Sequence, residues 1–359
     1  MNVRRVTSQD VARAAGVSRT TVSLVLNNVE AQISVDTRQR VLEAAKQLNY
    51  HPNASARRLV QGRTRVIGFV EHHSPYQSFA DAFMAEVLRG LHAVARQYNY
   101  HIIYEPTSDD DRDPDYHVKL VQERHVDGII YSGPRLNDVA LESLAEANIP
   151  VVLQGHLPGC PFSSVDIDNI SSAKLATDYL IGLGHTQIAM ITNGPLIYSA
   201  ATDRLTGYTL ALQAAGIEVN NDWIRIGSFT PDSGFQAMQS LLREKSRPSA
   251  VFVASDVVAM GAVEAIHQAD LRIPEDISII GFDNIPWVAY LNPPLTTINV
   301  PAHTLGWSAG LLLIQTLEND NFEHDNLLLD TELIVRHSCG NKREAQSPIV
   351  TQPPSFSSV

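Results

Sequence analysis

A small all-α head followed by a two-lobed α/β body with parallel sheets is the fold class that the sequence predicts. Residues 1–52 contain three helix patterns and a glycine turn. From residue 65 onward, short β-branched runs such as "RVIGFVE", "VDGIIYSG", "AVFVAS" and "ISIIGFD" alternate with amphipathic stretches. Apolar strands separated by helices are typical of parallel sheets covered on both faces. Because 359 residues exceed one typical core, we expect the body to form two lobes.

The composition is that of an ordinary globular protein. No apolar run reaches the roughly 18 residues that span a bilayer, and none follows the charged start "MNVRRVTSQD", so we expect neither a membrane span nor a signal peptide. The two cysteines, Cys160 and Cys339, are too few for a disulfide framework or a zinc site. We expect free thiols in a reducing cytoplasm, and we predict no cofactor.

The charge of the chain is divided unevenly. Residues 1–65 hold eleven Lys and Arg against four Asp and Glu, a net charge of +7. The whole chain carries −12, so the remainder carries −19. This asymmetry favours a head that binds a polyanion on an acidic body. A merely solvated basic surface is the alternative.

The head contains start and stop signals for three helices. "TSQD" at Thr7 is a capping box completed by Asp10, and Gly16 ends that helix. Ser18 caps a second helix over residues 19–26, and Ser34 opens a third in "SVDTRQRVLEAAKQLNY". The predicted apolar stripes of the three helices are Val11, Ala12 and Ala15; Val22, Val25 and Leu26; and Val41, Leu42, Ala45 and Leu48.

A helix, a short glycine-containing turn and a second helix form the helix-turn-helix pattern. In that motif, the second helix lies in the major groove of DNA. Leu24 falls almost opposite Val22 and Val25 at about 100° per residue, beside Thr20 and Ser23, and Arg19 also lies on the side away from the core. Arginine can bond guanine and an apolar side chain can contact a thymine methyl, so these residues are candidate base readers. A three-helix interaction module that binds no DNA is the alternative.

The segments "VTSQDVARAAGVSRTTVSLVLNN" and "VDTRQRVLEAAKQLNYHPNASARRL" resemble the lac repressor and purine repressor family of bacterial transcription regulators, and the resemblance continues to about residue 338. It implies a DNA-binding domain at 1–52, a hinge helix and linker at 53–64, and a two-lobed effector-binding and dimerisation domain at 65–338. In the hinge, Leu59 matches the leucine that wedges into the minor groove. Leu24 departs from the arginine common in the family, so the operator sequence cannot be copied from relatives. The implied DNA contacts are Thr7, Ser18, Arg19, Thr20, Ser23, Leu24, Asn27, Ser34, Thr37, Asn53, Arg57 and Leu59.

For the body, the resemblance implies the periplasmic-binding-protein-like fold of Rossmann-like lobes, between which the chain crosses three times. We place the crossings near residues 166–168, 297–301 and 321–326, so that "LLLDTELIVRHS" completes the second lobe. Residues 339–359 are rich in Pro and Ser and lack a leucine heptad, so we expect a disordered tail and a homodimer rather than a tetramer.

Ligands of open α/β sheets bind outside the carboxyl ends of the strands. Phe229, Ser255 and Asp283 follow predicted strands, and the family places the positions of Arg204, Phe229 and Asp283 in an effector cleft between the lobes. Taken singly, these three could be a helix-start ion pair, a core residue and a helix cap. The predicted effector residues are Asp81, Phe83, Asp168, Arg204, Phe229, Ser255, Asp283 and Trp287. An insertion makes the loop at 71–81 unlike that of the family.

Enzyme motifs are missing from the sequence, with no phosphate loop, nucleophile elbow or metal-binding His-Glu-x-x-His, so we do not expect an enzyme. His72 and His73 lack a third ligand at a useful spacing and are expected in a surface loop. We therefore predict a transcription regulator, acting as a repressor, whose binding to a pseudo-palindromic operator is switched by a small ligand. A sugar is favoured over a purine or nucleoside corepressor, and a transport-type sugar-binding protein is the other alternative.

Overall fold

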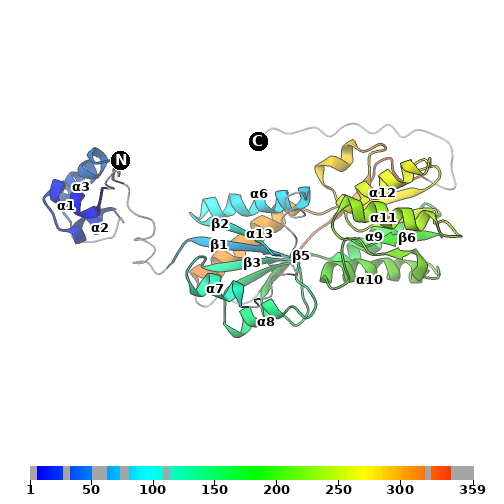
Figure 1. The fold of residues 1–359 in the computed structure, drawn as a ribbon, viewed down its shortest axis with the longest axis horizontal. Helices are drawn as coiled ribbons and strands as arrows, with labels where there is room; N and C mark the ends of the chain where they lie inside the picture. The colour runs from blue at the N-terminus through cyan, green and yellow to red at the C-terminus, as the bar shows by residue number, and fades with distance from the viewer. Residues whose placement is uncertain are drawn as a thin grey trace. The chain divides into compact units, whose positions relative to one another are not determined.

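The computed structural model describes residues 6–26, 33–50, 63–72, 81–107, 113, 115–319 and 325–340. The chain divides into two compact units, Met1–Arg65 and Val66–Val359 (Figure 1). Asn27, Asn53, Arg57 and Leu59 lie outside the described residues, as do most of the expected hinge and the tail. The predicted domain boundaries there stay predictions.

The small unit contains the three predicted helices, α1 (Ser8–Ala15), α2 (Arg19–Leu26) and α3 (Val35–Gln47). The Thr7–Asp10 capping box is present, and Gly16 ends α1 in the left-handed conformation. Ser18 accepts a hydrogen bond from the Thr21 N–H at 3.0 Å, which confirms its capping role. Ser34 does the same for the Thr37 N–H at 3.2 Å.

The core of the small unit differs from the prediction on α3. Val11, Val22 and Val41 are completely buried at its centre. Leu42 is 49% exposed, whereas Ala44 is buried. Leu42 lies about 100° around the helix from Val41 and so falls at the edge of the buried face. Its prediction as a core residue is wrong.

The first lobe of the body is a parallel six-stranded sheet with the order β11-β5-β4-β3-β1-β2. Helices α6 (Ala82–Gln97) and α13 (Ala302–Glu318) cover one face, and α7 (Tyr116–Gln122) and α8 (Val139–Glu146) cover the other (Figure 1). The strands are β1 (Val66–Glu71), β2 (His101–Pro106), β3 (Gly128–Ser132), β4 (Val151–Gln154), β5 (Ser163–Ile167) and β11 (Asn326–Leu329).

The second lobe repeats this architecture with the strand order β12-β10-β9-β8-β6-β7, in which only β12 is antiparallel. Helices α9 (Asn169–Gly182) and α10 (Ser199–Ala214) cover one face, and α11 (Pro231–Leu242) and α12 (Asp256–Gln268) cover the other. The strands are β6 (Ile188–Ile191), β7 (Ile224–Arg225), β8 (Ala250–Val253), β9 (Ser278–Asp283), β10 (Thr296–Asn299) and β12 (Glu332–Ile334). Two short 3₁₀ helices, η1 (Asn221–Trp223) and η2 (Pro286–Tyr290), complete the lobe.

Two of the three predicted crossings between the lobes are confirmed, between β5 and α9 and between β10 and α13. The third was placed wrongly at 321–326. Strand β11 pairs with β5 in the first sheet and β12 pairs with β10 in the second, so the chain crosses at residues 330–331. The leucine run looked like a continuation into the second lobe, but it forms an edge strand of the first, where Leu328 is 60% exposed.

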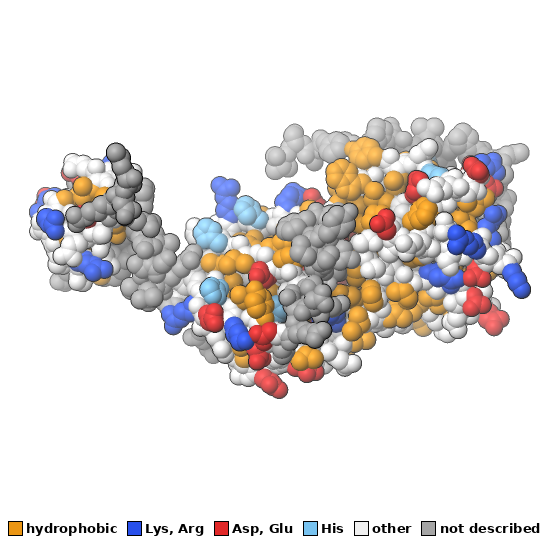
Figure 2. All heavy atoms as spheres, viewed as in Figure 1, with side chains coloured by type: hydrophobic (Ala, Val, Ile, Leu, Met, Phe, Trp, Pro, Cys, Tyr) orange, Lys and Arg blue, Asp and Glu red, His pale blue; other side chains and the backbone are white. Residues whose placement is uncertain are grey.

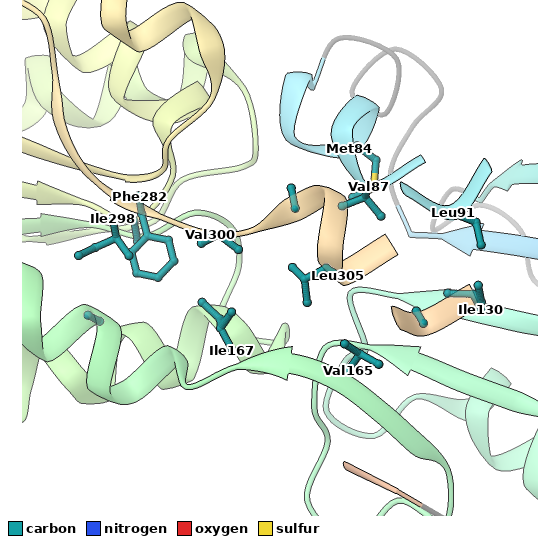
Figure 3. Close-up of a cluster of buried hydrophobic side chains, with 14 of the residues drawn as sticks. Met84, Val87, Leu91, Ile130, Val165, Ile167, Phe282, Ile298, Val300 and Leu305 are labelled. Carbon is teal, nitrogen blue, oxygen red and sulfur yellow. The ribbon is translucent and has the colours of Figure 1, made fainter. Parts of the chain in front are cut away.

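One of the apolar clusters of the body runs through both lobes. Alternate side chains of each strand face opposite helix layers, so Ile67 and Phe69 face α6 and α13 while Val66 and Val70 face α7 and α8. The first of these layers continues across the crossings through Ile167 and Val300 to the core of the second lobe (Figure 3). The two lobes are therefore joined by buried apolar side chains as well as by the chain itself.

The helix pair α11 and α12 approaches at backbone distance through Gly261. A Cβ atom on Gly261 would lie 1.7 Å from the Pro231 carbonyl oxygen. The α6 and α13 pair is similar, since a Cβ on Gly306 would lie 1.9 Å from the Val87 carbonyl oxygen. Any larger side chain at these positions must push the helices apart.

We predict that Gly261→Ala lowers the free energy of unfolding by about 1–3 kcal/mol because it overpacks this contact. Gly182 in α9 has no neighbouring atom within 4 Å of an added Cβ. Gly182→Ala is therefore the matched control and should leave stability unchanged or raise it by up to about 1 kcal/mol. Urea unfolding followed by circular dichroism measures both. Equal effects of the two substitutions would contradict the close-packing explanation.

Candidate ligand cavity and nucleic-acid interface

The predicted DNA-reading side of α2 is open in the small unit. Arg19, Thr20 and Ser23 are exposed, and Arg19 Nε donates to Ser8 Oγ at 3.0 Å. Leu24 is half-buried rather than fully exposed, but it is not among the side chains packed into the core of this unit. Leu24 lies about 200° around α2 from the fully buried Val22.

Four other predicted DNA contacts organise helix starts. Thr7, Ser18 and Ser34 supply the capping oxygens of α1, α2 and α3, and Ser34 Oγ donates to Thr37 Oγ1 at 2.9 Å. Helix N-termini attract phosphate groups through their amides and dipole. Figure 2 shows Lys and Arg side chains at the visible face of this unit. Side chains at such positions can contact phosphate oxygens, and contacts of that kind carry no base-sequence information.

A cavity that is partly open to solvent lies between the two lobes of the body. Six of the eight predicted effector residues line it, namely Asp81, Phe83, Arg204, Phe229, Ser255 and Asp283. Asp81 and Phe83 come from the start of α6 in the first lobe, and the other four come from the second lobe. Phe229, Ser255 and Asp283 were predicted from their places after strands, whereas Asp81, Phe83 and Arg204 were predicted from the family resemblance.

Asp168 and Trp287 are not on the cavity wall in the structure, so their predicted placement is wrong. Asp168 is exposed and caps α9, where its carboxylate accepts from the Ser171 N–H at 2.8 Å. Hydrogen bonding from the Ser171 side chain and from its N–H lowers the pKa of Asp168. Trp287 lies in η2 with 57% of its surface exposed.

Sequence reasoning missed several wall residues. Ser132, Gln154 and Asn193 lie at or just after the ends of β3, β4 and β6. The strand-end rule applied to every strand would have found them. Asp166 and Tyr198 also line the cavity, but Asp166 lies within a strand and Tyr198 precedes a helix. No spacing in the sequence distinguished these two.

Arg204 is the central cation of the cavity, and only 8% of its surface is exposed. Its Nε donates to Asn169 Oδ1 at 2.9 Å, and its Nη1 donates to the Ala254 carbonyl at 2.6 Å. Nη1 also lies 3.6 Å from Asp283 Oδ1, and the guanidinium carbon lies 3.8 Å from the centre of the Phe282 ring. These contacts hold the planar guanidinium in one orientation beside the cavity.

The turn after β9 holds Asp283 in place. Asp283 adopts φ 112°, a conformation that non-glycine residues rarely adopt. Buried Asp256 supports this turn, because its carboxylate accepts from the Ile285 N–H at 3.0 Å and from the Thr297 hydroxyl at 2.8 Å. Strained backbone fixed by such contacts is typical of binding sites.

Phe229 forms an aromatic wall with Tyr198. The residue has φ 54°, and its N–H donates to the Asn193 carbonyl at 2.8 Å. Its ring meets the Tyr198 ring edge-on, with 5.0 Å between ring centres. A Cβ on Gly194 would lie 2.1 Å from the Phe229 ring, so only glycine leaves room for it. The cavity therefore combines an aromatic face with polar groups, as sites for small polar rings do.

The cavity has more carboxylates than cations, since Asp81, Asp166 and Asp283 line it with Arg204. Burial raises the pKa of Asp166 to about 6. Burial also raises the pKa of Asp283 to about 7, against the opposing effect of Arg204. Among the described residues, no group of three His, Cys, Asp or Glu side chains is placed to hold a metal ion.

We predict that the wild-type protein loses stability as the pH rises from about 4 to about 7. A carboxyl whose pKa is raised by folding binds protons that the unfolded chain has already released, so the free energy of unfolding falls with pH over that interval. Asp283→Asn should flatten this decline in a series of melting temperatures. Asp168→Asn is the control, because its lowered pKa places its titration below this interval. A decline unchanged by Asp283→Asn would refute the assignment.

Comparisons with known proteins agree with both parts of the chain. The model for "Bacterial regulatory proteins, lacI family" matches residues 7–53, and the model for a "Periplasmic binding protein-like domain" matches residues 177–339. The HTH-type transcriptional regulator CelR of Thermobifida fusca is 36% identical over 93% of this chain and 98% of its own length. The HTH-type transcriptional repressor PurR of Aliivibrio salmonicida is 35% identical over 92% of this chain and 98% of its own length.

Solved structures give the same result. A CelR–cellobiose complex superposes with a TM-score of 0.71 at 34% identity, covering 93% of this chain and all of that one. A lac repressor dimer bound to operator and the anti-inducer ONPF gives 0.83 at 29% identity, covering 94% and all of that chain. In the part of the chain that the structure describes, no helix is both long and apolar enough to cross a membrane.

Proposed function

This chain belongs to the lacI family of bacterial regulatory proteins and is a DNA-binding transcriptional regulator, and from that premise we propose that a neutral sugar in the body cavity switches its binding to an operator. The observation that supports this most directly is the cavity itself, in which polar residues from both lobes surround an aromatic wall. We further propose that the protein acts in the cytoplasm as a repressor and as a homodimer, placing two heads on a pseudo-palindromic site.

In this proposal, α2 enters the major groove with Arg19, Thr20 and Leu24 toward the bases. Leu24 contacts a thymine methyl, since an apolar side chain has no other specific partner at the base edges. The capped helix starts at Thr7, Ser18 and Ser34 fix the register on the phosphates. The net charge of +7 on residues 1–65 supplies the attraction that is independent of base sequence.

The electrostatics of the cavity favour a neutral ligand with many hydroxyl groups. The three carboxyl groups can accept hydrogen bonds from sugar hydroxyls, and they outnumber Arg204, the lining cation that could hold a phosphate or carboxylate ligand. Phe229 and Tyr198 offer ring surfaces on which a sugar can lie. The CelR relative in complex with cellobiose supports the same class of ligand.

A purine is the second candidate, because PurR repressors are relatives and the same aromatic wall would accept a base. For either ligand, we assign the carboxylates a binding role and not a catalytic one. A ligand that closes the lobes would change the free energy of operator binding by about 1–3 kcal/mol, the usual size of such coupling.

We predict that Leu24→Ala weakens binding to an operator selected from a random DNA library by about 5- to 100-fold, the cost of one lost base contact. Binding to unrelated DNA should not change, because phosphate contacts remain. Fluorescence anisotropy at fixed salt measures both. Leu42→Ala, an exposed leucine on α3, is the control. Equal losses on selected and unrelated DNA would show that Leu24 does not read bases.

We predict that a sugar from a panel of sugars and nucleobases stabilises the protein by about 2.7 kcal/mol at 100 times its dissociation constant. Asp283→Asn should reduce this stabilisation, because it removes a carboxylate acceptor from the cavity. Trp287→Ala should leave it intact, because Trp287 is not on the cavity wall. Thermal unfolding gives the readout. Stabilisation by a purine alone would replace the sugar with the second candidate.

A further inference from the structure

We propose that Tyr198 is a positioning residue that latches the two lobes together over the cavity. Its hydroxyl donates to the His72 carbonyl at 2.8 Å, although the two residues are 126 positions apart. Tyr198 lies at the start of α10 in the second lobe, whereas His72 follows β1 in the first lobe. This hydrogen bond therefore spans the opening between the lobes.

The backbone extends the latch on both sides of Tyr198. Tyr198 forms an isolated antiparallel bridge with Arg135 of the first lobe. The Leu136 N–H donates to the Ile197 carbonyl at 2.7 Å. A short two-stranded contact thus joins residues 134–136 to residues 197–199. Opening the lobes would expose these backbone groups to water and break their hydrogen bonds.

The latch also caps the helix that carries Arg204. The start of α10 has no side-chain cap of its own. Instead, the Ser199 N–H and Oγ both point to the Pro134 carbonyl of the first lobe, at 3.3 Å and 3.4 Å. The first N–H groups of a helix need partners outside the helix. Lobe closure therefore completes the N-terminal end of α10, about one and a half turns before Arg204.

The first lobe presents a rigid acceptor for Tyr198. Buried Asp138 accepts from the Tyr131 hydroxyl at 2.8 Å and from the Ala140 N–H at 3.2 Å, which fixes the turn after β3. The His72 ring is hydrogen-bonded to Tyr131, and only 8% of the His72 side chain is exposed. The prediction of His72 in a surface loop is therefore wrong. This network holds the His72 carbonyl where the Tyr198 hydroxyl meets it.

Tyr198 also faces the cavity, with its ring edge-on to Phe229. The same side chain thus contacts the ligand space and the opposite lobe. A ligand that packs on this ring would restrict its rotation and favour the hydrogen bond to His72. Ligand binding in the cavity and closure of the lobes would then both depend on the rotamer of Tyr198.

Hydrogen exchange of the ligand-free, full-length chain tests the latch directly. Tyr198→Phe keeps the ring and removes only the hydroxyl. We expect exchange to accelerate by about three- to tenfold in segments 133–138 and 196–201, the effect of losing one net hydrogen bond. Segment 128–132 in the first sheet should not change. Tyr290→Phe, a tyrosine 76% exposed on η2, is the matched control.

Unchanged exchange of Tyr198→Phe in segments 133–138 and 196–201 would overturn the proposal. Equal acceleration in segment 128–132 would overturn it too, because it would indicate a general loss of stability. A melting temperature close to that of the wild type verifies folding. A second measurement rests on the proposed function and titrates cellobiose, for which we expect Tyr198→Phe to bind about three- to tenfold more weakly. If no sugar of the panel, cellobiose included, binds the wild-type chain, the proposed function fails, while the ligand-free exchange still decides on the latch.

Discussion

The buried guanidinium of Arg204 is the interaction on which the architecture of the cavity depends. It joins Asn169 at the start of α9, the Ala254 carbonyl after β8 and Asp283 at the end of β9. Three separate chain segments are thereby fixed around one planar cation. Removing one partner from a buried charge pair costs about 3–5 kcal/mol, because the remaining charge stays buried without compensation. The site is thus held by the same contacts that stabilise the second lobe.

The DNA-binding unit and the ligand-binding body carry opposite net charges. The basic small unit carries short capped helices and a modest core, whereas the acidic body carries the ligand cavity. Like charge repels DNA from the body, so the phosphate backbone is attracted to the head alone. Within the body, carboxyl groups outnumber cations on the cavity wall, which suits the neutral ligand proposed above. One overall charge pattern therefore serves specificity at both sites.

Local signals predicted the fold well. The capping hydrogen bonds of Thr7 and Ser34 join residues only three positions apart, so the sequence shows where these helices begin. Buried parallel strands are apolar along their whole length, so they are also visible in the sequence. The prediction failed where position depended on packing between distant segments. Leu42 matched the helical period but falls at the edge of the buried face, and the leucines of β11 form an edge strand in the other lobe. Asp168 was correctly seen at a crossing, but its carboxylate bonds locally. Tyr198 was missed because its partner lies 126 residues away.

The three crossings leave little freedom for the lobes to move independently. Each crossing is only one or two residues long between regular elements, and Ile167 and Val300 at two of them are buried in the shared core. Three short crossings resist twisting of one lobe against the other far more than a single crossing would. The lobes can therefore bend about a common axis, but they can hardly rotate about their long axis or slide. A small change in the angle between the lobes at the cavity would therefore move the far ends of the lobes by a larger distance and in one direction.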